Sequence, residues 1–318
     1  MSGKDCAADL AIFITNRYKR AMSPTHASDD QYATGLALLA KPLMPLARIV
    51  QMLYLTGPFD TVAAVLDELR EPIETNNATY DDPAAMLRPH LDLLQTFERF
   101  KHPQPPLARI LDADENPLDP VEAIALHVGQ RLLTRELETI NSLLCAPCGC
   151  TLCCVGPDGA QRQDFFEIPL QDEETTLFAL PQVDSQESRA TSPYHEPPLV
   201  RAQRPFYQTD AALYHWRDGW SMILPRHTTC PHLAQATGHC TIYPDRPDVC
   251  RRPQIFSYVL EREQNLDVEV DGRTVPGFIG RSKLLAIWDC PYVQRFKDQI
   301  ASFAEACGLE PVFKENKG

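Results

Sequence analysis

The residues of this sequence best suited to chemistry are its cysteines, which number 11 among 318 residues. Five of them fall within ten positions, directly after a predicted helix. These are Cys145, Cys148, Cys150, Cys153 and Cys154. Thiolates are the ligands that zinc and iron–sulfur clusters prefer, and a loop can turn several of them toward one metal. The spacing therefore predicts a metal-binding segment.

Four more candidate ligands lie downstream. Cys230, Cys240 and Cys250 follow at equal intervals, and Cys290 directly precedes Pro291. With the first five, the three evenly spaced thiols make eight, enough for two four-coordinate sites, and Cys290 is a spare. A helix start lowers the pKa of a thiol and favours ligation, whereas a cysteine before proline also serves as an ordinary N-cap. All four are included among the candidate metal ligands.

The spacing also bears on the identity of the metal. The gaps between the first cysteines match neither the bacterial ferredoxin run nor a zinc ribbon. Adjacent Cys153 and Cys154 are expected to point in different directions, so that they serve two metals or one ligates while the other packs. Irregularly spaced donors that are all thiolates favour an iron–sulfur cluster over zinc.

Basic residues near the downstream cysteines have a physical role beside such a site. Four thiolates on Zn²⁺ or on a [4Fe–4S]²⁺ core leave about two negative charges, which guanidinium groups offset and hydrogen-bond. Of the nearby arginines, Arg246 and Arg251 are expected to contact the site. His227, His232 and His239 are expected to be loop residues or hydrogen-bond donors, since eight thiols already satisfy two sites.

Two stretches of the sequence resemble the YkgJ-type CxxCxxCC cysteine-cluster family, whose members are described as zinc- or iron-chelating domains. The stretches are CAPCGCTLCC at 145–154 and, within 230–251, the segments CPHL, GHCTIY and RPDVCR. The family has two residues between its second cysteine and its Cys-Cys pair, whereas here four follow Cys148, with Cys150 among them. Either of these two can occupy the second family position. The resemblance implies metal chelation within residues 144–253 and no particular reaction, although flagellin lysine methylases have a similar cysteine cluster.

Composition limits the other classes of protein. Apolar residues make up 44% and charged residues 23%, which is typical of a globular chain. The net charge of −13 and the pI near 5.1 argue against binding to nucleic acid or to an anionic membrane. The first 22 residues do not resemble a signal peptide, and no stretch of about 18 apolar residues predicts a membrane span. We expect a cytoplasmic protein, where clustered cysteines indicate metal binding rather than disulfides.

The elements that must position the cysteines begin with helices. Residues 1–144 are predicted to be mainly helical. The clearest helix has Asp119 as its N-cap, and its apolar residues recur at helical spacing up to Leu144. Shorter helices are predicted at 45–53 and after an N-cap at Asp60.

Beyond residue 144 the sequence predicts short strands and turns. Asp218-Gly219 and Asp271-Gly272 are each expected to close a hairpin, and a final helix is expected from Pro291. Residues 182–205, rich in Ser, Pro, Glu and Gln, are predicted to form a long surface loop. We therefore predict an α+β fold, with an N-terminal helical region (1–144) followed by a small irregular cysteine-rich metal-binding domain (145–318) that has short hairpins and a C-terminal helix.

The leading interpretation is a cytoplasmic metal-binding protein with one or two cysteine-ligated centres, iron–sulfur ahead of zinc, and an undefined reaction. One alternative is a cluster-dependent enzyme, such as a redox enzyme or a protein lysine methylase-like protein. Another is a structural zinc domain that binds a protein through the helical region. Common dinucleotide, phosphate-loop, metalloprotease and hydrolase motifs are missing from the sequence. The expected partners are a metal ion or cluster and a protein bound by the helical region, with no nucleic acid and no membrane.

Overall fold

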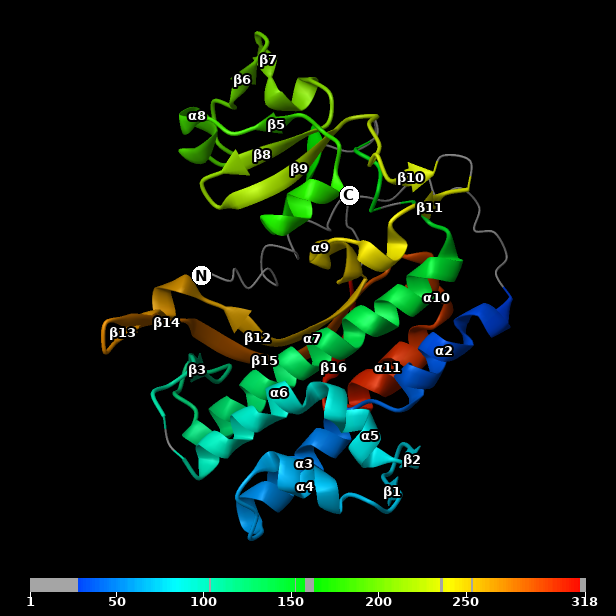
Figure 1. The fold of residues 1–318 in the computed structure, drawn as a ribbon, viewed down its shortest axis with the longest axis vertical. Coiled ribbons are helices and arrows are strands. Elements are labelled where there is room, and N and C mark those ends of the chain that lie inside the picture. Colours follow the sequence, from blue (N-terminus) through cyan, green and yellow to red (C-terminus); the bar gives the residue numbers. More distant parts are fainter. Residues whose placement is uncertain are drawn as a thin grey trace. The chain divides into compact units, whose positions relative to one another are not determined.

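The computed structural model describes residues 28–102, 104–151, 153–157, 163–234, 237–252 and 254–314 (Figure 1). They fall into two compact units. The helical unit comprises Asp29–Leu144 with Gln254–Lys314, and the cysteine unit comprises Cys145–Pro253. These units differ in one respect from the predicted division into 1–144 and 145–318, because the chain returns to the helical unit after residue 253. The mixed α+β class is confirmed.

In the helical unit, some helices precede the main strands β12 and β15 in the chain and others follow them. Its helices are α2 (Asp29–Ala40), α3 (Met44–Thr56), α4 (Val62–Glu68), α5 (Pro83–Leu87), η1 (Arg88–His90), α6 (Leu91–Leu94), η2 (Gln95–Phe100), α7 (Pro120–Cys148), η6 (Gln264–Leu266), α10 (Pro291–Arg295) and α11 (Lys297–Ala306). Its strands are β1 (Ile73–Glu74), β2 (Thr79–Tyr80), β3 (Arg109–Leu111), β12 (Ile255–Arg262), β13 (Val268–Val270), β14 (Arg273–Val275), β15 (Gly277–Ile287) and β16 (Glu310–Lys314). The last four residues of α7 belong to the cysteine unit.

Strand β15 is the centre of the main sheet in the helical unit. It pairs antiparallel with β12 along most of its length. Its other edge pairs in parallel with β3 at 277–279 and with β16 at 283–287. The predicted hairpin at Asp271-Gly272 is confirmed as the antiparallel pair of β13 and β14.

Helix α7 is the long helix that the sequence predicts. The carboxylate of Asp119 accepts hydrogen bonds from the backbone N–H groups of Val121 (2.8 Å) and Glu122 (3.1 Å), so the predicted N-cap is confirmed. Its apolar stripe is fully or nearly fully buried, at Val128, Leu132, Leu133, Leu137, Ile140 and Leu144. The helix continues to Cys148 and therefore carries the first of the clustered cysteines in its last turn.

Two polar side chains also join α7 to β12. The side-chain carbonyl of Gln130 accepts hydrogen bonds from the backbone N–H groups of Val259 (2.9 Å) and Leu260 (3.0 Å), at a β-bulge. The Asn141 side chain, 1% exposed, accepts from the Ile255 N–H (3.0 Å) and donates to its carbonyl (2.6 Å). It also accepts from the Gln254 N–H and the Tyr292 hydroxyl. These bonds satisfy backbone groups that burial would otherwise leave unpaired.

The cysteine unit is built on a small sheet with the strand order β4-β9-β8-β5. Its helices and strands are β4 (Phe165–Leu170), η3 (Glu173–Leu177), β5 (Gln182–Val183), α8 (Gln186–Arg189), β6 (Val200–Arg201), β7 (Arg204–Pro205), η4 (Phe206–Gln208), β8 (Ala212–Trp216), β9 (Gly219–Pro225), β10 (Leu233–Ala234), β11 (His239–Cys240), η5 (Tyr243–Asp245) and α9 (Asp248–Arg251). The antiparallel pair of β8 and β9 confirms the hairpin predicted at Asp218-Gly219.

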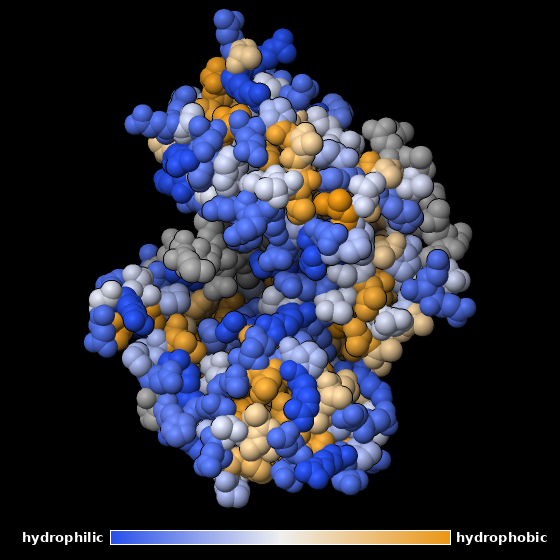
Figure 2. Space-filling model, in the orientation of Figure 1, coloured by the Kyte–Doolittle hydropathy of each residue, from blue (hydrophilic) through white to orange (hydrophobic). Residues whose placement is uncertain are grey.

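Alternation along β9 gives this sheet two different faces. Met222 and Leu224 pack in a cluster that also contains Cys230, whereas Ile223 packs on the opposite face with Tyr214 and other aromatic residues. One face of the sheet is therefore the support of the cysteine region. Hydrophilic residues cover most of the molecular face drawn in Figure 2, with apolar residues in small groups between them.

Three details differ from the sequence predictions. Thr61 rather than Asp60 caps α4, because Thr61 has the extended backbone that an N-cap needs and its hydroxyl accepts from the Ala64 N–H. The expected loop at 182–205 contains β5, α8, β6 and β7. The expected C-terminal helix is two helices, since the backbone at Phe296 leaves the helical conformation between α10 and α11.

Residues 29–56 contain an 18-residue window with a mean hydropathy of 1.4, which gives this stretch the length and composition of a membrane span. This finding differs from the expectation that no such stretch exists. In the structure the segment is two helices, α2 and α3, and Leu46, Val50 and Tyr54 of α3 are fully buried in the protein core. Burial in the core accounts for these apolar residues of α3, whereas Met52 and Leu55 of the same helix are exposed.

Replacing Asn141 tests the polar join between α7 and β12. Asn141→Leu would leave two buried backbone N–H groups and the Tyr292 hydroxyl without this acceptor. We expect the free energy of unfolding to fall by about 2–4 kcal/mol, measured by denaturant unfolding. The exposed Asn77→Leu is the matched control and should change it by less than about 0.5 kcal/mol. Equal effects of the two substitutions would contradict this account.

Glu136 on α7 predicts a pH-dependent stability. Its side chain is buried, one oxygen accepts from the Leu43 N–H at 2.9 Å, and burial raises the pKa of the carboxyl to about 8. Because the unfolded carboxyl loses its proton near its ordinary pKa of 4.5, stability should fall as pH rises from about 4.5 to 8.

The substitution Glu136→Gln mimics the neutral carboxyl at every pH. The variant should therefore gain thermal stability relative to the natural chain at pH 8 and much less at pH 5, by thermal unfolding followed with circular dichroism. A difference in Tm that is the same at both pH values would show that the charge of Glu136 does not limit stability.

Candidate metal centre

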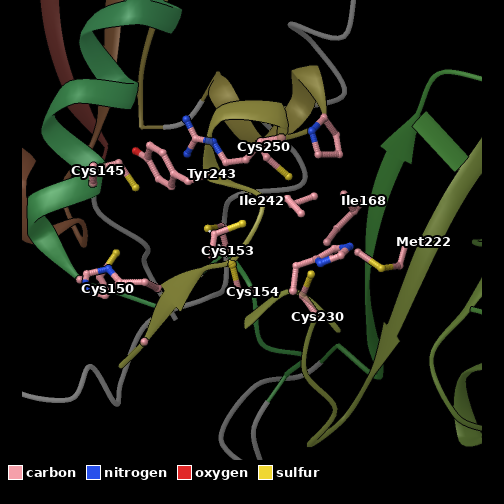
Figure 3. A pocket seen from close by; sticks show the side chains of 18 of the residues that line it. Cys145, Cys150, Cys153, Cys154, Ile168, Met222, Cys230, Ile242, Tyr243 and Cys250 are labelled. Carbon is pink, nitrogen blue, oxygen red and sulfur yellow. Dashed lines mark hydrogen bonds between the residues drawn. The ribbon is translucent and has the colours of Figure 1, made fainter. Parts of the chain in front are cut away.

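Seven cysteines of the cysteine unit line a single pocket (Figure 3). They are Cys145, Cys150, Cys153, Cys154, Cys230, Cys240 and Cys250. The cavity has a volume of about 50 Å³, several times the space that one water molecule needs. Apolar side chains of Ile168, Phe178 and Met222 complete one wall. We call this cavity the cysteine pocket.

Backbone pairing brings the two cysteine-containing stretches together. The Cys230 N–H donates to the Cys154 carbonyl and the Gly156 N–H donates to the Thr228 carbonyl, both at 2.8 Å. Gly156 is required here, because a Cβ atom would lie 2.0 Å from the Pro225 carbonyl oxygen. The sulfur atoms of two segments 76 positions apart in the chain, at 154 and 230, therefore reach the same cavity.

The vicinal pair brings two sulfur atoms close together. The Cys153 and Cys154 sulfur atoms lie 3.5 Å apart, and both side chains line the cysteine pocket. This differs from the expectation that adjacent cysteines point in different directions. Packing explains the difference, since Cys154 rests against the apolar cluster of the sheet that also contains Cys230.

Cys153 interacts electrostatically with five of the other thiols. A charge on Cys153 raises the pKa of five other cysteines, Cys145, Cys154, Cys230, Cys240 and Cys250. Burial is the larger cause for most of them, and it raises the pKa of Cys145 to about 12 and of Cys230 to about 11. The thiols are therefore protonated at neutral pH unless a cation compensates their charge.

An arginine and a tyrosine provide the compensating groups in the protein itself. Arg246, 7% exposed, lowers the pKa of Cys145, Cys240 and Cys250 by its positive charge. Its guanidinium carbon lies 3.7 Å from the centre of the Tyr243 ring, and the Tyr243 hydroxyl hydrogen-bonds the Cys145 sulfur. Arg246 thus holds the tyrosine against a thiol and supplies charge to the pocket.

The two arginines expected at the site have different positions. Arg246 lines the cysteine pocket and Arg251 does not. Instead, the Arg251 guanidinium donates to the backbone carbonyls of Arg246 and Pro244, both at 2.9 Å. Arg251 therefore braces the turn that presents Arg246.

Two of the predicted ligands are not brought to the pocket. Cys148 is 2% exposed at the end of α7 and is not among the lining residues, although it lies near enough to raise the pKa of Cys145. Of the two candidates for the second family position, Cys150 is the one that lines the cavity. Cys290 is fully buried in the helical unit as the N-cap residue of α10. Its side chain makes no capping hydrogen bond to α10.

Of the histidines near the cysteines, His232 and His239 line the cysteine pocket, and the ring of His232 has a hydrogen-bonding role. The His232 Nε2–H donates to the Leu177 carbonyl at 2.7 Å, and Nδ1 lies 3.2 Å from the Thr241 hydroxyl. Both ring nitrogens of His232 are thus engaged, and the ring links β10 to the end of η3. The Cys230 sulfur accepts from the His232 backbone N–H, and the Cys240 sulfur accepts from the Ile242 N–H.

Tyr243 and the apolar wall are features that the sequence reasoning missed. Tyr243 belongs to the GHCTIY segment, and its position three residues before Arg246 is the available signal. Nothing in the sequence indicates that Met222 or Ile168, which lie on different strands, face the thiols.

The chemistry of the donors fits zinc or iron. Within the described ranges, no three His, Cys, Asp or Glu side chains are already close enough to form a complete coordination shell. Seven thiols nevertheless line one cavity, and a change of χ1 rotamer is the motion by which a cysteine redirects its sulfur atom toward an ion. Soft thiolate ligands in a largely apolar cavity are the donor set that zinc and iron–sulfur centres use.

Comparison with known proteins agrees with this chemistry. Residues 144–270 match the CxxCxxCC family model, described as "Putative zinc- or iron-chelating domain". The match includes all seven cysteines of the cysteine pocket. Residues 144–270 are therefore similar to a family described as zinc- or iron-chelating, which agrees with a metal ion as the partner of the pocket. No curated protein and no solved structure matches the chain.

The raised thiol pKa values predict proton release on metal binding. Since burial keeps the thiols protonated at pH 7.5, each sulfur that becomes a ligand must lose a proton. A four-thiolate site should release about four protons per Zn²⁺, and apparent affinity should rise with pH between 6 and 9. Calorimetry of the reduced, metal-free chain in buffers of different ionisation enthalpy measures this number. Release of fewer than about two protons would contradict thiolate ligation by protonated thiols.

Proposed function

We propose that the CxxCxxCC domain holds one metal centre through four thiolates, those of Cys153, Cys154, Cys230 and Cys250. The observation that carries the proposal is the 3.5 Å separation of the Cys153 and Cys154 sulfur atoms within a pocket lined by thiols. Cys230 and Cys250 complete the set because each interacts electrostatically with both members of that pair.

The sulfur separation supports a shared metal atom. Two thiolates at about 2.3 Å from one tetrahedral ion lie about 3.8 Å apart, close to the separation of this pair. A mononuclear zinc or iron site and a [2Fe–2S] cluster both place two thiolates on one metal atom. A [4Fe–4S] cluster with four cysteine ligands places one thiolate on each iron. Of the iron–sulfur forms, the geometry therefore favours [2Fe–2S].

The number of cysteines that line the pocket supports one metal centre rather than two. A first centre with four thiolates leaves Cys145, Cys150 and Cys240 among the lining cysteines. Three thiols cannot complete a second four-thiolate site, and Cys148 does not line the cavity. Cys145 remains available to accept the Tyr243 hydrogen bond beside the centre.

Arg246 suits a centre of this charge. Four thiolates on a divalent zinc ion or a [2Fe–2S]²⁺ core leave about two negative charges, and a buried guanidinium in the same pocket offsets part of them. We favour iron because seven thiols line the pocket beside two imidazoles, those of His232 and His239, and both His232 nitrogens are engaged elsewhere. When bound, an iron–sulfur centre would supply one-electron chemistry, whereas zinc would supply structural cross-linking.

A cytoplasmic location is part of this proposal, because reduced thiols persist there.

Metal analysis of the full chain tests the proposal. We expect anaerobically purified protein to be coloured and to contain about two iron atoms and two sulfides per chain. One zinc per colourless chain would assign the same four thiolates to zinc and overturn the preference for iron. Protein without either metal, with seven or more thiols reacting freely in the native state, would overturn metal chelation itself.

Substitution of the central cysteine tests the ligand set. We expect Cys153→Ser to lose most of its metal, since Cys153 interacts electrostatically with all three other proposed ligands. Cys290→Ala is the matched control, a buried cysteine outside the cysteine pocket, and should retain full metal content. Equal metal content in the two variants would remove Cys153 from the ligand set, and loss in Cys290→Ala would restore that residue as a ligand.

A further inference from the structure

A second cavity lies within the helical unit, at the start of α7. Its volume is about 450 Å³, within the range of small-molecule binding sites. Its walls come from η2, the segment 104–110, residues 117–118 and the first turns of α7. We call this cavity the arginine pocket. The cysteines and the proposed metal centre are not part of it.

The floor of the arginine pocket is apolar and well anchored. Helical spacing places Pro120, Ala123, Ile124 and His127 on one face of α7, and all four line the cavity. Ile124 also packs against the core cluster of the helical unit, as does the lining residue Phe100 from η2. Because these side chains are held by the core, the cavity has a fixed apolar floor that fits a rigid apolar body.

The charges around this floor are of one sign. Arg99 and Arg109 line the cavity, and no described lining residue is an Asp or a Glu. Neither arginine forms an ion pair with a carboxylate in the described part of the chain. In a protein of net charge −13, where carboxylates outnumber basic groups, two arginines without carboxylate partners beside an apolar cavity favour an anionic ligand.

The two arginines differ in how they are held. The Arg99 guanidinium hydrogen-bonds the Pro105 carbonyl and so fixes the segment that forms the rim. Arg109 begins β3, where its backbone N–H donates to the Pro276 carbonyl at 2.9 Å, and its side chain is exposed. A fixed backbone with a solvent-accessible guanidinium makes Arg109 the better anchor for an incoming anion.

Neighbouring groups do not compete for this role. The Asp119 carboxylate, which lies between lining residues in the sequence, is engaged in capping α7 through Val121 and Glu122. Burial, with the charges of Arg131 and Arg99, lowers the pKa of His127 to about 4. His127 is therefore neutral at pH 7 and offers the ligand a hydrogen bond without a second charge.

We propose that the arginine pocket binds a small carboxylate with an apolar body, whose carboxylate pairs with Arg109 and whose body covers Ile124 and Ala123. A guanidinium forms two parallel hydrogen bonds with the two oxygens of a carboxylate, which gives orientation as well as affinity. An apolar body then removes the exposed apolar floor from water. The ligand is an apolar acid because the cavity offers guanidinium groups and a neutral imidazole at an apolar surface.

Titration of the full-length chain with 2-naphthoate, followed by its fluorescence and by calorimetry, tests the proposal. We expect one saturable site per chain and binding of the neutral analogue 2-naphthamide at least about tenfold weaker. Arg109→Gln should weaken naphthoate binding about tenfold. Ala123→Phe, which fills the cavity, should abolish it, with circular dichroism confirming that each variant is folded.

Arg70→Gln is the control, since it removes the same charge from an exposed arginine of the helical unit that does not line the cavity. It should leave naphthoate affinity within about twofold of the natural chain. Equal affinities of Arg109→Gln and Arg70→Gln, equal binding of naphthoate and naphthamide, or the absence of saturable binding would each overturn the proposal. Tighter binding of 2-naphthyl phosphate than of naphthoate would overturn the assignment to a carboxylate.

Discussion

The cysteine unit depends on one electrostatic constraint, which is that several buried thiols cannot ionise together without a cation. Cys153 interacts electrostatically with five other cysteines, and burial raises the pKa of Cys145 and Cys230 far above neutrality. Arg246 supplies one positive charge to this environment and cannot balance four thiolates. A divalent metal can, because it replaces the protons of its ligands. Zinc or iron chelation, the chemistry that describes the matched family, would supply such a cation.

Backbone pairing and side-chain packing hold the cysteines of the pocket in place. Backbone hydrogen bonds between 154–156 and 228–230 place Cys154 next to Cys230, and Gly156 permits the close approach of the chains. Met222 and Leu224 project from one face of the sheet and give these cysteines an apolar support. Arg251 holds the turn that carries Arg246. These cysteines are therefore supported by packed elements rather than by an isolated loop.

Helix α7 contributes residues to both pockets. Its last turn provides Cys145, and its first turns provide the floor of the arginine pocket. Between them the buried stripe and the side chains of Gln130 and Asn141 join it to β12. A helix held in this way cannot shift along its axis without losing hydrogen bonds to buried backbone groups. These hydrogen bonds fix α7 within the helical unit, and with it the floor of the arginine pocket.

The sequence by itself determined the elements and the chemistry that depend on local spacing. The cap at Asp119, the stripe of α7 and the hairpin at Asp218-Gly219 follow from residues near one another in the chain. The similarity to a zinc- or iron-chelating family rests on the spacing within two separate cysteine segments, 145–154 and 230–251. Tertiary structure decided which thiols share a cavity. It brought Cys150 rather than Cys148 to the pocket, buried Cys290 in the other unit and placed Tyr243 beside Cys145. The reason is physical: spacing fixes the reach of a side chain, whereas burial and long-range strand pairing fix its direction.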